Sequence, residues 1–462
     1  MTGRQDSRYS PLSLWLDRLD ASLKPRRGLP GDVDVDVAIV GGGFSGLWTA
    51  YYLLQHDPSL RVCIVERDIC GFGASGRNGG WCVGELAASV ESYAKHGSHE
   101  SALSLLRHTF DTVDEVGRVV ATEGIDCDFA KGGTLRWARS EPQERRQRDE
   151  IDEMHALGIG EDIIRLLDAD EARSIGNATA VRGGIFFAPS AALDPAKLVR
   201  GLASVVEQQG CSIYEQTAAI SIGDGQVTTA AGTITAGHVI RATEAYTRDL
   251  PGERRTLLPL YSLMVATEPL DESVFDEIGL AGRPTFADDR YMVIYGQRTA
   301  DNRIAFGGRG APYMFGSRID SATERDSGAH DLIARTLIEL FPALEDAEIT
   351  HRWGGVLGAP RNWTPAVTYD AVTGSGHLGG YVGEGVAASN LAARTMADLV
   401  TGASSELVAL PWTNVRWRRW EPEPLRWGGV RVGRWLMRKA DEAESRTDKD
   451  SRVAMRLSRM LR

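Results

Sequence analysis

The chain has few cysteines for its length, and none of them is spaced for a metal or redox site. Five occur in 462 residues, namely Cys63, Cys70, Cys82, Cys127 and Cys211. Their odd number and the absence of a CxxC pair argue against a disulfide framework and against a zinc site. His96 and His99 have a spacing that a metal can use, but a solvated loop is the favoured interpretation. We therefore expect a reduced, cytoplasmic protein without a bound metal.

Long apolar runs, a basic excess and a GxSxG nucleophile motif are also missing. Charged residues between Arg4 and Asp20 interrupt the N-terminus, so no signal peptide is expected. The longest uncharged run, 37–55, contains a glycine cluster, which favours a strand, turn and helix over a membrane span. Because 63 acidic residues oppose 52 basic ones, the net charge of −11 argues against nucleic acid as the main partner.

The remaining composition is that of a folded protein. Apolar residues make up 42% and charged residues 25% of the chain, which is typical of a globular protein. The length predicts two domains, or a pair of domains that the chain enters more than once.

A glycine-rich turn follows the first predicted strand, 34–40. Gly41, Gly43 and Gly46 stand in a GxGxxG pattern, and a helical pattern begins at Ser45. The first glycine permits a tight turn, the second lets the backbone approach a pyrophosphate, and the third lets the helix pack on the strand. The free N–H groups of the helix would then face the phosphates. This context predicts a bound dinucleotide.

An acidic residue, Glu66, ends the second predicted strand, 61–65, about twenty residues beyond the last glycine. A carboxylate there accepts the ribose hydroxyls of an adenosine and repels a 2′-phosphate, so NADP is disfavoured. These residues do not separate NAD from FAD. The alternative without a ligand is a glycine-rich turn followed by a solvent-exposed glutamate.

Two further glycine clusters favour a flavin. Residues 73–80, GASGRNGG, can wrap the pyrophosphate and ribityl chain, with Ser75 as a hydroxyl donor and Arg77 as a cation for the phosphates. A flexible surface loop is the alternative for this segment. Residues 379–385 lead into a predicted helix, 387–400, whose N-terminus can stabilise the negative edge of a reduced isoalloxazine ring.

With residues 127–134 (CDFAKGGT) and 261–270 (YSLMVATEPL), these clusters resemble the D-amino-acid oxidase superfamily of FAD-dependent oxidoreductases. The resemblance covers residues 10–402 and is nearest the gamma-glutamylputrescine oxidase branch. It implies an α/β fold, with a Rossmann-like, discontinuous FAD-binding domain and a second α+β substrate domain built on a mostly antiparallel sheet.

The implied FAD-binding domain consists of 34–110, 180–258 and 350–402, and the substrate domain of 111–179 and 259–349. Residues 1–33 form an N-terminal extension and 403–462 a tail. The sequence agrees at Asp194 and Pro195, which are the N-cap and first residue of a predicted helix. The residues 291–297 and 303–308 are predicted to form a hairpin.

The residues expected to contact FAD share the glycine clusters and their flanks, and Ala219 matches the backbone position that meets adenine in relatives. They are Gly41, Gly43, Phe44, Ser45, Gly46, Glu66, Arg67, Gly73, Ala74, Ser75, Arg77, Asn78, Gly79, Gly80, Ala219, Gly355, Gly383, Glu384, Gly385 and Val386.

The chain departs from sarcosine-type relatives at three places. They attach FAD through a cysteine where this chain has Leu357, and no cysteine follows Cys211, so noncovalent FAD is expected. Their oxygen-activating lysine is absent from 304–309, which leaves the electron acceptor open. Their carboxylate-binding lysine is replaced by Val386-Ala387, while Glu384 lies beside it. A carboxylate there would attract an ammonium group. Equally, Glu384 could accept hydrogen bonds from backbone N–H groups or pair with an arginine.

We therefore expect a small amine or amino acid as substrate, with an amine such as gamma-glutamylputrescine favoured. Hydride transfer from the C–H beside the nitrogen to flavin N5 gives an imine, which water hydrolyses. The residues expected to line the substrate site are Trp81, Tyr261, Tyr291, Arg309, Trp353 and Glu384. The alternatives are a flavin monooxygenase that NAD(P)H reduces, or a non-catalytic flavin-binding subunit.

The C-terminal tail differs from the rest of the chain because it is basic and rich in tryptophan. Its pattern predicts an amphipathic helix whose apolar face contains Leu425, Val432, Trp435, Leu436, Ala440 and Ala443. Packing on its own chain or on a sister subunit is favoured, and contact with an anionic membrane surface is the alternative.

Overall fold

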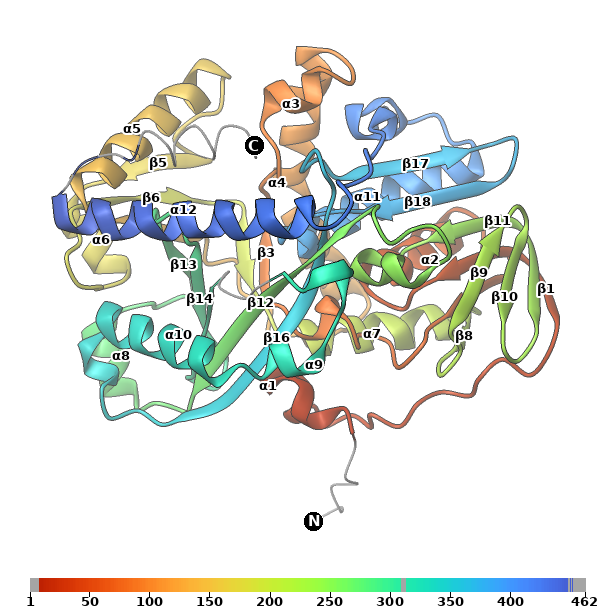
Figure 1. Cartoon of the computed structure of the whole chain (residues 1–462), viewed down its shortest axis with the longest axis horizontal. Helices are drawn as coiled ribbons and strands as arrows, with labels where there is room; N and C mark the ends of the chain where they lie inside the picture. Colours follow the sequence, from red (N-terminus) through yellow and green to blue (C-terminus); the bar gives the residue numbers. More distant parts are fainter. Residues whose placement is uncertain (1–7, 309–312, 448, 450, 452–462) are drawn as a thin grey trace.

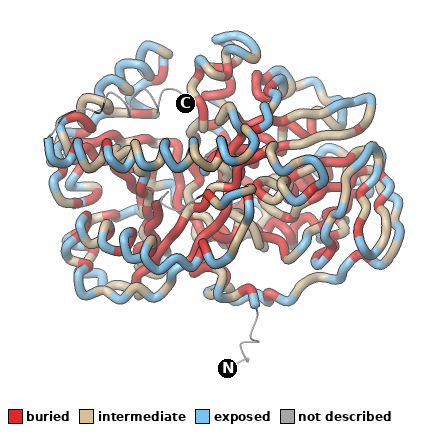
Figure 2. The backbone as a smooth tube through the Cα atoms, in the orientation of Figure 1, coloured by how far each residue is buried: buried red, intermediate tan, exposed pale blue. Residues whose placement is uncertain are grey.

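The computed structural model describes residues 8–308, 313–447, 449 and 451. Two sheets lie side by side, with helices packed around them (Figure 1). The central strands of both sheets are buried, as Figure 2 shows. The candidate Arg309 lies outside the described residues.

The first sheet contains the dinucleotide-type strands that the sequence predicts. Its order is β17 (Ala366–Asp370), β18 (Ser375–Gly379), β11 (Thr233–Arg241), β1 (Val33–Val40), β2 (Val62–Val65) and β8 (Ser212–Tyr214), and β10 (Gln226–Thr229) pairs with β11 and with β9 (Ala219–Gly223). The neighbours from β18 to β8 are parallel, whereas β17, β10 and β9 pair antiparallel. Because the central strands are covered on both faces, β2 is apolar and buried throughout.

The second sheet has the order β16 (Ile349–Ala359), β12 (Leu258–Thr267), β15 (Ile304–Gly308), β14 (Ile294–Arg298), β13 (Thr285–Asp288), β4 (Thr134–Ala138), β6 (Gly183–Phe187) and β5 (Ile164–Leu167). Its pairs are antiparallel except β4 with β13. The hairpin predicted from 291–297 and 303–308 is confirmed as β14 and β15. A small ribbon pairs β3 (Trp81–Val83) with β7 (Ser190–Ala192).

Helices complete the fold. The α-helices are α1 (Leu14–Asp17), α2 (Phe44–His56), α3 (Val90–Ala94), α4 (His99–Thr122), α5 (Glu141–Ala156), α6 (Ala169–Ile175), α7 (Pro195–Gln208), α8 (Glu272–Ile278), α9 (Ser321–Glu324), α10 (Ser327–Leu340), α11 (Gly385–Thr401) and α12 (Leu425–Thr447). Short 3-10 helices are η1 (Ser10–Leu12), η2 (Ala74–Gly76), η3 (Glu244–Asp249), η4 (Phe315–Ser317), η5 (Pro342–Leu344), η6 (Glu406–Ala409) and η7 (Pro411–Asn414). Helices α2, α4, α7 and α11 share a core with one face of the first sheet. The predicted cap is confirmed, since the Asp194 side chain accepts from Ala196 N and Lys197 N at the start of α7.

Two strands of the expected FAD-binding segments join the second sheet. Strands β6 and β16 pair within the second sheet, although the expected FAD-binding segments 180–258 and 350–402 include them. Both strands are largely buried, and an apolar pattern does not reveal which of two sheets a strand joins.

The tail helix α12 forms where the sequence predicts an amphipathic helix. Of the residues predicted for its apolar face, Leu425, Val432 and Trp435 are 67%, 57% and 52% exposed in the single chain, whereas Ala440 is buried. Arg426 and Glu444 are buried as well, so charged partners contribute to the packing of this helix on the rest of the chain. Within the described ranges, no helix has both the length and the apolar character that crossing a membrane requires.

Candidate active site

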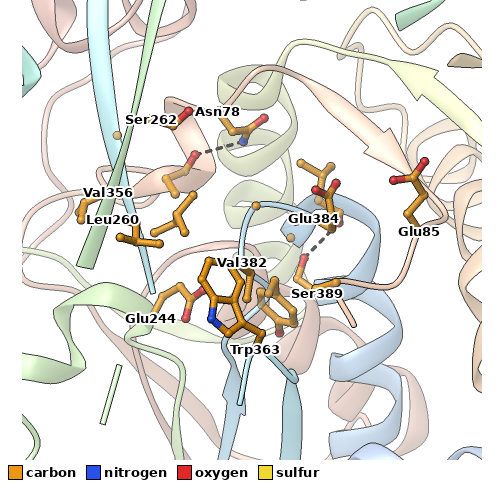
Figure 3. A pocket seen from close by; sticks show the side chains of 18 of the residues that line it. Asn78, Glu85, Glu244, Leu260, Ser262, Val356, Trp363, Val382, Glu384 and Ser389 are labelled. Carbon is orange, nitrogen blue, oxygen red and sulfur yellow. Dashed lines mark hydrogen bonds between the residues drawn. The ribbon is translucent and has the colours of Figure 1, made fainter. Parts of the chain in front are cut away.

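A cavity of about 1320 Å³ runs from the carboxyl ends of the first sheet to strands of the second sheet and to α12. Single ligand pockets commonly measure about 300 to 1,000 Å³, so this one has room for a dinucleotide and a substrate. Figure 3 shows side chains around this cavity. Asn78, Glu244 and Glu384 come from segments next to the first sheet, and Ser262 comes from β12 of the second sheet.

The first glycine turn is built for close backbone approach. Gly41 has a φ of +116°, and a Cβ there would lie 2.4 Å from the Ala242 carbonyl oxygen. A Cβ at Gly46 would lie 2.0 Å from the Gly41 carbonyl oxygen. Helix α2 begins directly after Gly43, so its N-terminus lies at the cavity, which Gly41, Gly43, Phe44 and Ser45 line. Gly46 instead keeps the helix close to the strand.

Glu66 lies at the edge of the cavity, where the sequence places it. Its carboxylate accepts from Gly42 N at 2.8 Å and from Asp68 N at 2.9 Å. Burial raises the pKa of this carboxyl, while the two N–H groups oppose that shift. The guanidinium of Arg67 lies 4.5 Å from the Tyr246 ring centroid, beside the same pocket. Glu66 therefore offers a hydrogen-bond acceptor, and Arg67 a positive charge, to an adenosine.

The second turn is held by its own side chains. Ser75 Oγ accepts from Phe44 N at 2.9 Å, which ties this turn to the first. Asn78 donates to the Ala74 carbonyl at 3.1 Å and accepts from Gly80 N at 2.7 Å. Gly73, Ala74, Ser75, Asn78 and Gly79 line the cavity. Gly80 does not, because it packs where a Cβ would lie 2.2 Å from the Leu193 carbonyl oxygen.

Arg77 has a different partner from the one expected. Its guanidinium donates to Glu324 at 2.8 Å and to the Tyr246 hydroxyl at 3.1 Å, and its side chain is 2% exposed. A buried carboxylate such as Glu324 needs a paired cation, which explains this arrangement. Arg77 thus lines the cavity while its charge serves Glu324.

The third glycine cluster is fixed by a residue that the sequence reasoning missed. Glu244, just after β11, accepts from Gly380 N at 3.0 Å, and its φ is +43°. Burial raises the pKa of this carboxyl to about 7. Gly383, Glu384, Gly385 and Val386 line the cavity at the start of α11. The only sequence signal for Glu244 is an acid near the carboxyl end of a parallel strand.

Ala219 and Gly355 also line the cavity, as do the substrate candidates Trp81, Tyr261 and Tyr291. The Trp81 indole donates to the Gly296 carbonyl at 3.1 Å, and the Tyr261 hydroxyl accepts from Asp320 N at 2.6 Å. Burial raises the pKa of Tyr261 to about 12. Trp353 does not line the cavity. It is 3% exposed and donates to the Arg77 carbonyl from behind the second turn.

A profile of the DAO family, FAD dependent oxidoreductase, matches residues 36–399. This chain belongs to that family. The enzyme is an FAD-dependent oxidoreductase, and the glycine turns with Glu66 are the residues that fit FAD. Gly41 and Gly43 line the cavity, and a Cβ on either would collide with Ala242 or Ser75, so the close backbone approach that a pyrophosphate site needs depends on glycine at both positions.

Curated relatives of this FAD-dependent oxidoreductase cover most of its length. It is 31% identical to a probable oxidoreductase OrdL of Rhizobium meliloti, over 82% of this chain and 86% of the relative. It is 28% identical to the gamma-glutamylputrescine oxidoreductase of Escherichia coli, over 80% of this chain and 84% of the relative. Among solved structures, glycine oxidase from Geobacillus kaustophilus aligns with a TM-score of 0.67 at 21% identity, covering 83% of this chain and 99% of that one.

Several charged residues of the oxidoreductase cavity were not anticipated. Arg136 of β4 lies 3.0 Å from Asp289 and 2.5 Å from Glu150 of α5. Burial raises the pKa of the Asp289 carboxyl to about 6. Glu85, after β3, lines the same cavity (Figure 3). These residues come from separate segments without a shared motif, so no sequence signal groups them.

Proposed function

We propose that this enzyme oxidises the C–N bond of an amine to an imine, which water hydrolyses to a carbonyl compound and an amine. The observation that supports it is one continuous cavity, in which Glu384 and Glu85 line the same space as the FAD residues. Bound FAD supplies the hydride acceptor of this reaction.

Charge favours an amine over a substrate held by its carboxylate. Glu384 stands at the start of α11, directly after the third glycine cluster. An ammonium group is attracted to such a carboxylate, whereas a substrate carboxylate placed there would be repelled in a partly desolvated site. Glu85 lines the same cavity as Glu384 and the FAD residues. We assign Glu384 and Glu85 to holding the amine next to the flavin.

The side walls position this amine. Trp81, Tyr261 and Tyr291 offer ring surfaces, and the Trp81 and Tyr261 polar groups are engaged by backbone partners. Rings fixed in this way orient a C–H bond without offering a competing nucleophile. No cysteine occurs among the described residues that line the cavity, which supports noncovalent FAD.

The substrate favoured within this class resembles gamma-glutamylputrescine. One relative over 80% of the chain is named for that compound, and the cavity extends well beyond the glycine turns. A flavin monooxygenase and a non-catalytic flavin subunit remain the competing functions.

One anaerobic experiment separates these functions. The purified holoenzyme is mixed with amines, amino acids or NAD(P)H while flavin absorbance is followed. Bleaching by an amine is expected; bleaching by NAD(P)H alone would establish the monooxygenase, and no bleaching the non-catalytic subunit. Admitting air afterwards distinguishes an oxidase from a dehydrogenase by the rate of flavin reoxidation.

We also propose that the outward face of α12 contacts an anionic membrane surface. Val432 and Trp435 are exposed there, and Arg431 and Arg438 flank them. Sedimentation with phosphatidylserine vesicles should be lost in the Val432→Asp, Trp435→Asp variant. Equal sedimentation of both proteins would rule out this contact, and a mass change on substitution would indicate a sister subunit instead.

A further inference from the structure

One face of α12 forms a wall of the active-site cavity. The lining residues follow helical spacing, at intervals of three and four, and are Leu425, Arg426, Gly429, Val430, Gly433, Arg434 and Met437. From the first to the last of these the helix advances about 18 Å, at about 1.5 Å per residue. Figure 1 shows α12 crossing the molecule in front of the second sheet.

The wall is anchored at both ends. Near its C-terminus, the Asp441 carboxylate accepts from Tyr291 N at 2.7 Å and Met292 N at 2.8 Å. Glu444, which is 3% exposed, pairs with Arg146 of α5 at 2.8 Å. These contacts join the helix to the segment that contains the substrate candidate Tyr291.

At the other end, Glu423 accepts from the Tyr313 hydroxyl at 2.6 Å and pairs with Arg426 at 3.0 Å. Arg426 is buried, and its guanidinium lies 5.5 Å from the Tyr313 ring centroid. Hydrogen-bonded charges at both ends hold the intervening turns in place.

The face that meets the cavity is shallow. Gly429 and Gly433 have no side chain, and nothing lies within 4 Å of the position that a Cβ at Gly429 would take. Glycine inside a helix costs about 1 kcal/mol relative to alanine. Here the missing side chains leave space along the wall, between the apolar Val430 and Met437.

This wall is additional to the part of the chain that defines the family. The family match ends at residue 399, and α12 begins at Leu425. The shared fold therefore supplies the FAD site, whereas the outer boundary of the substrate cavity comes from the tail.

We infer that α12 determines which substrates the enzyme accepts, by admitting amines long enough to lie along Gly429 and Gly433. This inference rests on the proposed amine oxidation. A short amine would reach only the residues beside the flavin, while an elongated N-acyl diamine would also contact the helix. A larger side chain on this face should therefore weaken the binding of long amines more than the binding of short ones.

The test compares Gly429→Leu with Gly428→Leu. Gly428 is the neighbouring helix residue, also has open space at its Cβ position, and does not line the cavity. With gamma-glutamylputrescine, Gly429→Leu should raise KM about tenfold or more, the range for a pocket altered by a few methylenes. With propylamine, KM should change less than about twofold. FAD content and circular dichroism check that both variants fold.

A second measurement needs binding only. Gly429→Cys and Gly428→Cys are labelled with a maleimide; the five native cysteines are buried and react slowly. Gamma-glutamylputrescine should slow labelling at residue 429 and leave residue 428 unchanged, and propylamine should protect neither. Equal effects at the two positions, or equal effects on short and long amines, would overturn the inference. If neither amine bleaches the flavin of the unaltered enzyme, the proposed function is overturned instead, and the protection experiment still tests the inference because protection does not require turnover.

Discussion

The Glu244 carboxylate accepts a hydrogen bond of 3.0 Å from Gly380 N, and so ties the end of β11 to the glycine cluster before α11. Gly358 and Gly379 lie so close that a Cβ on either would come within about 3 Å of the same carboxylate oxygen, at 3.1 and 3.0 Å. One buried acid thus sets the spacing between three segments that line the FAD cavity.

Replacing Glu244 should change how stability depends on pH. Burial raises the pKa of this carboxyl from 4.5 to about 7 in the folded chain. Its contribution is therefore fully present below the unfolded pKa and is lost as pH rises through about 7. A shift of that size corresponds to roughly 3 kcal/mol.

The measurement is urea unfolding of Glu244→Gln and of the unaltered enzyme between pH 4.5 and 8. The variant should gain stability relative to the unaltered enzyme across this window. Glu277→Gln, at an exposed position, provides the control. Parallel curves for all three proteins would show that Glu244 does not retain its proton in the fold.

Gly41→Ala should impair both folding and FAD binding. The backbone has a φ of +116°, and the new Cβ would meet the Ala242 carbonyl oxygen at 2.4 Å. Gly210 is a matched control, since its φ is +103° but nothing lies within 4 Å of its Cβ position. Gly210→Ala should cost about 1 to 2 kcal/mol from backbone strain alone. Gly41→Ala should cost more and reduce the FAD content of the purified protein; equal FAD content in both variants would contradict this.

Arg77→Met should destabilise the enzyme strongly, because it leaves the Glu324 carboxylate without its cation. Both side chains are largely buried, and breaking such a pair costs about 3 to 5 kcal/mol. Arg352 and Asp331 form an exposed pair 3.0 Å apart, so Arg352→Met should cost less than about 1 kcal/mol. Urea unfolding measures both. Recovery of stability in Arg77→Met, Glu324→Gln would confirm the cause, while a cost no greater than that of Arg352→Met would refute it.

Glu384→Gln should weaken amine binding more than it slows the oxidation of bound amine. A hydrogen bond to a charged group contributes about 1.5 to 3 kcal/mol, so the apparent dissociation constant should rise roughly 10-fold to 100-fold. Anaerobic stopped-flow bleaching of the flavin separates the dissociation constant from the limiting rate. Glu406→Gln, on the exposed 3-10 helix after α11, is the control. An unchanged dissociation constant would remove Glu384 from the amine site.

The local motifs could be predicted from the sequence because their geometry depends on near neighbours. The turn at Gly41, the cap at Asp194 and the hairpin of β14 and β15 are confirmed. Each follows from steric limits on the backbone and from hydrogen bonds between residues close in the chain. The same locality explains why the glycine clusters already indicated FAD.

Side-chain partners over long separations could not be predicted in this way. Arg77 and Glu324 are 247 residues apart, and the phosphate role expected for Arg77 overlooked that buried acid. Trp353 was expected to line the cavity because aromatic side chains often do, but it packs behind the second turn. In both cases burial and charge pairing, which arise only when distant segments meet, decided the position.

The sequence by itself determined that this chain binds a dinucleotide, through glycines and one acid whose spacing fixes the local backbone. Only the tertiary structure decided which charged residues share a cavity with the glycine turns. It brought Glu85, Arg136 and Asp289 into the cavity that Glu384 lines, and it placed the glycine-bearing face of α12 along the cavity wall. The physical reason is that backbone geometry is a short-range property, whereas desolvation and charge pairing depend on which segments pack together.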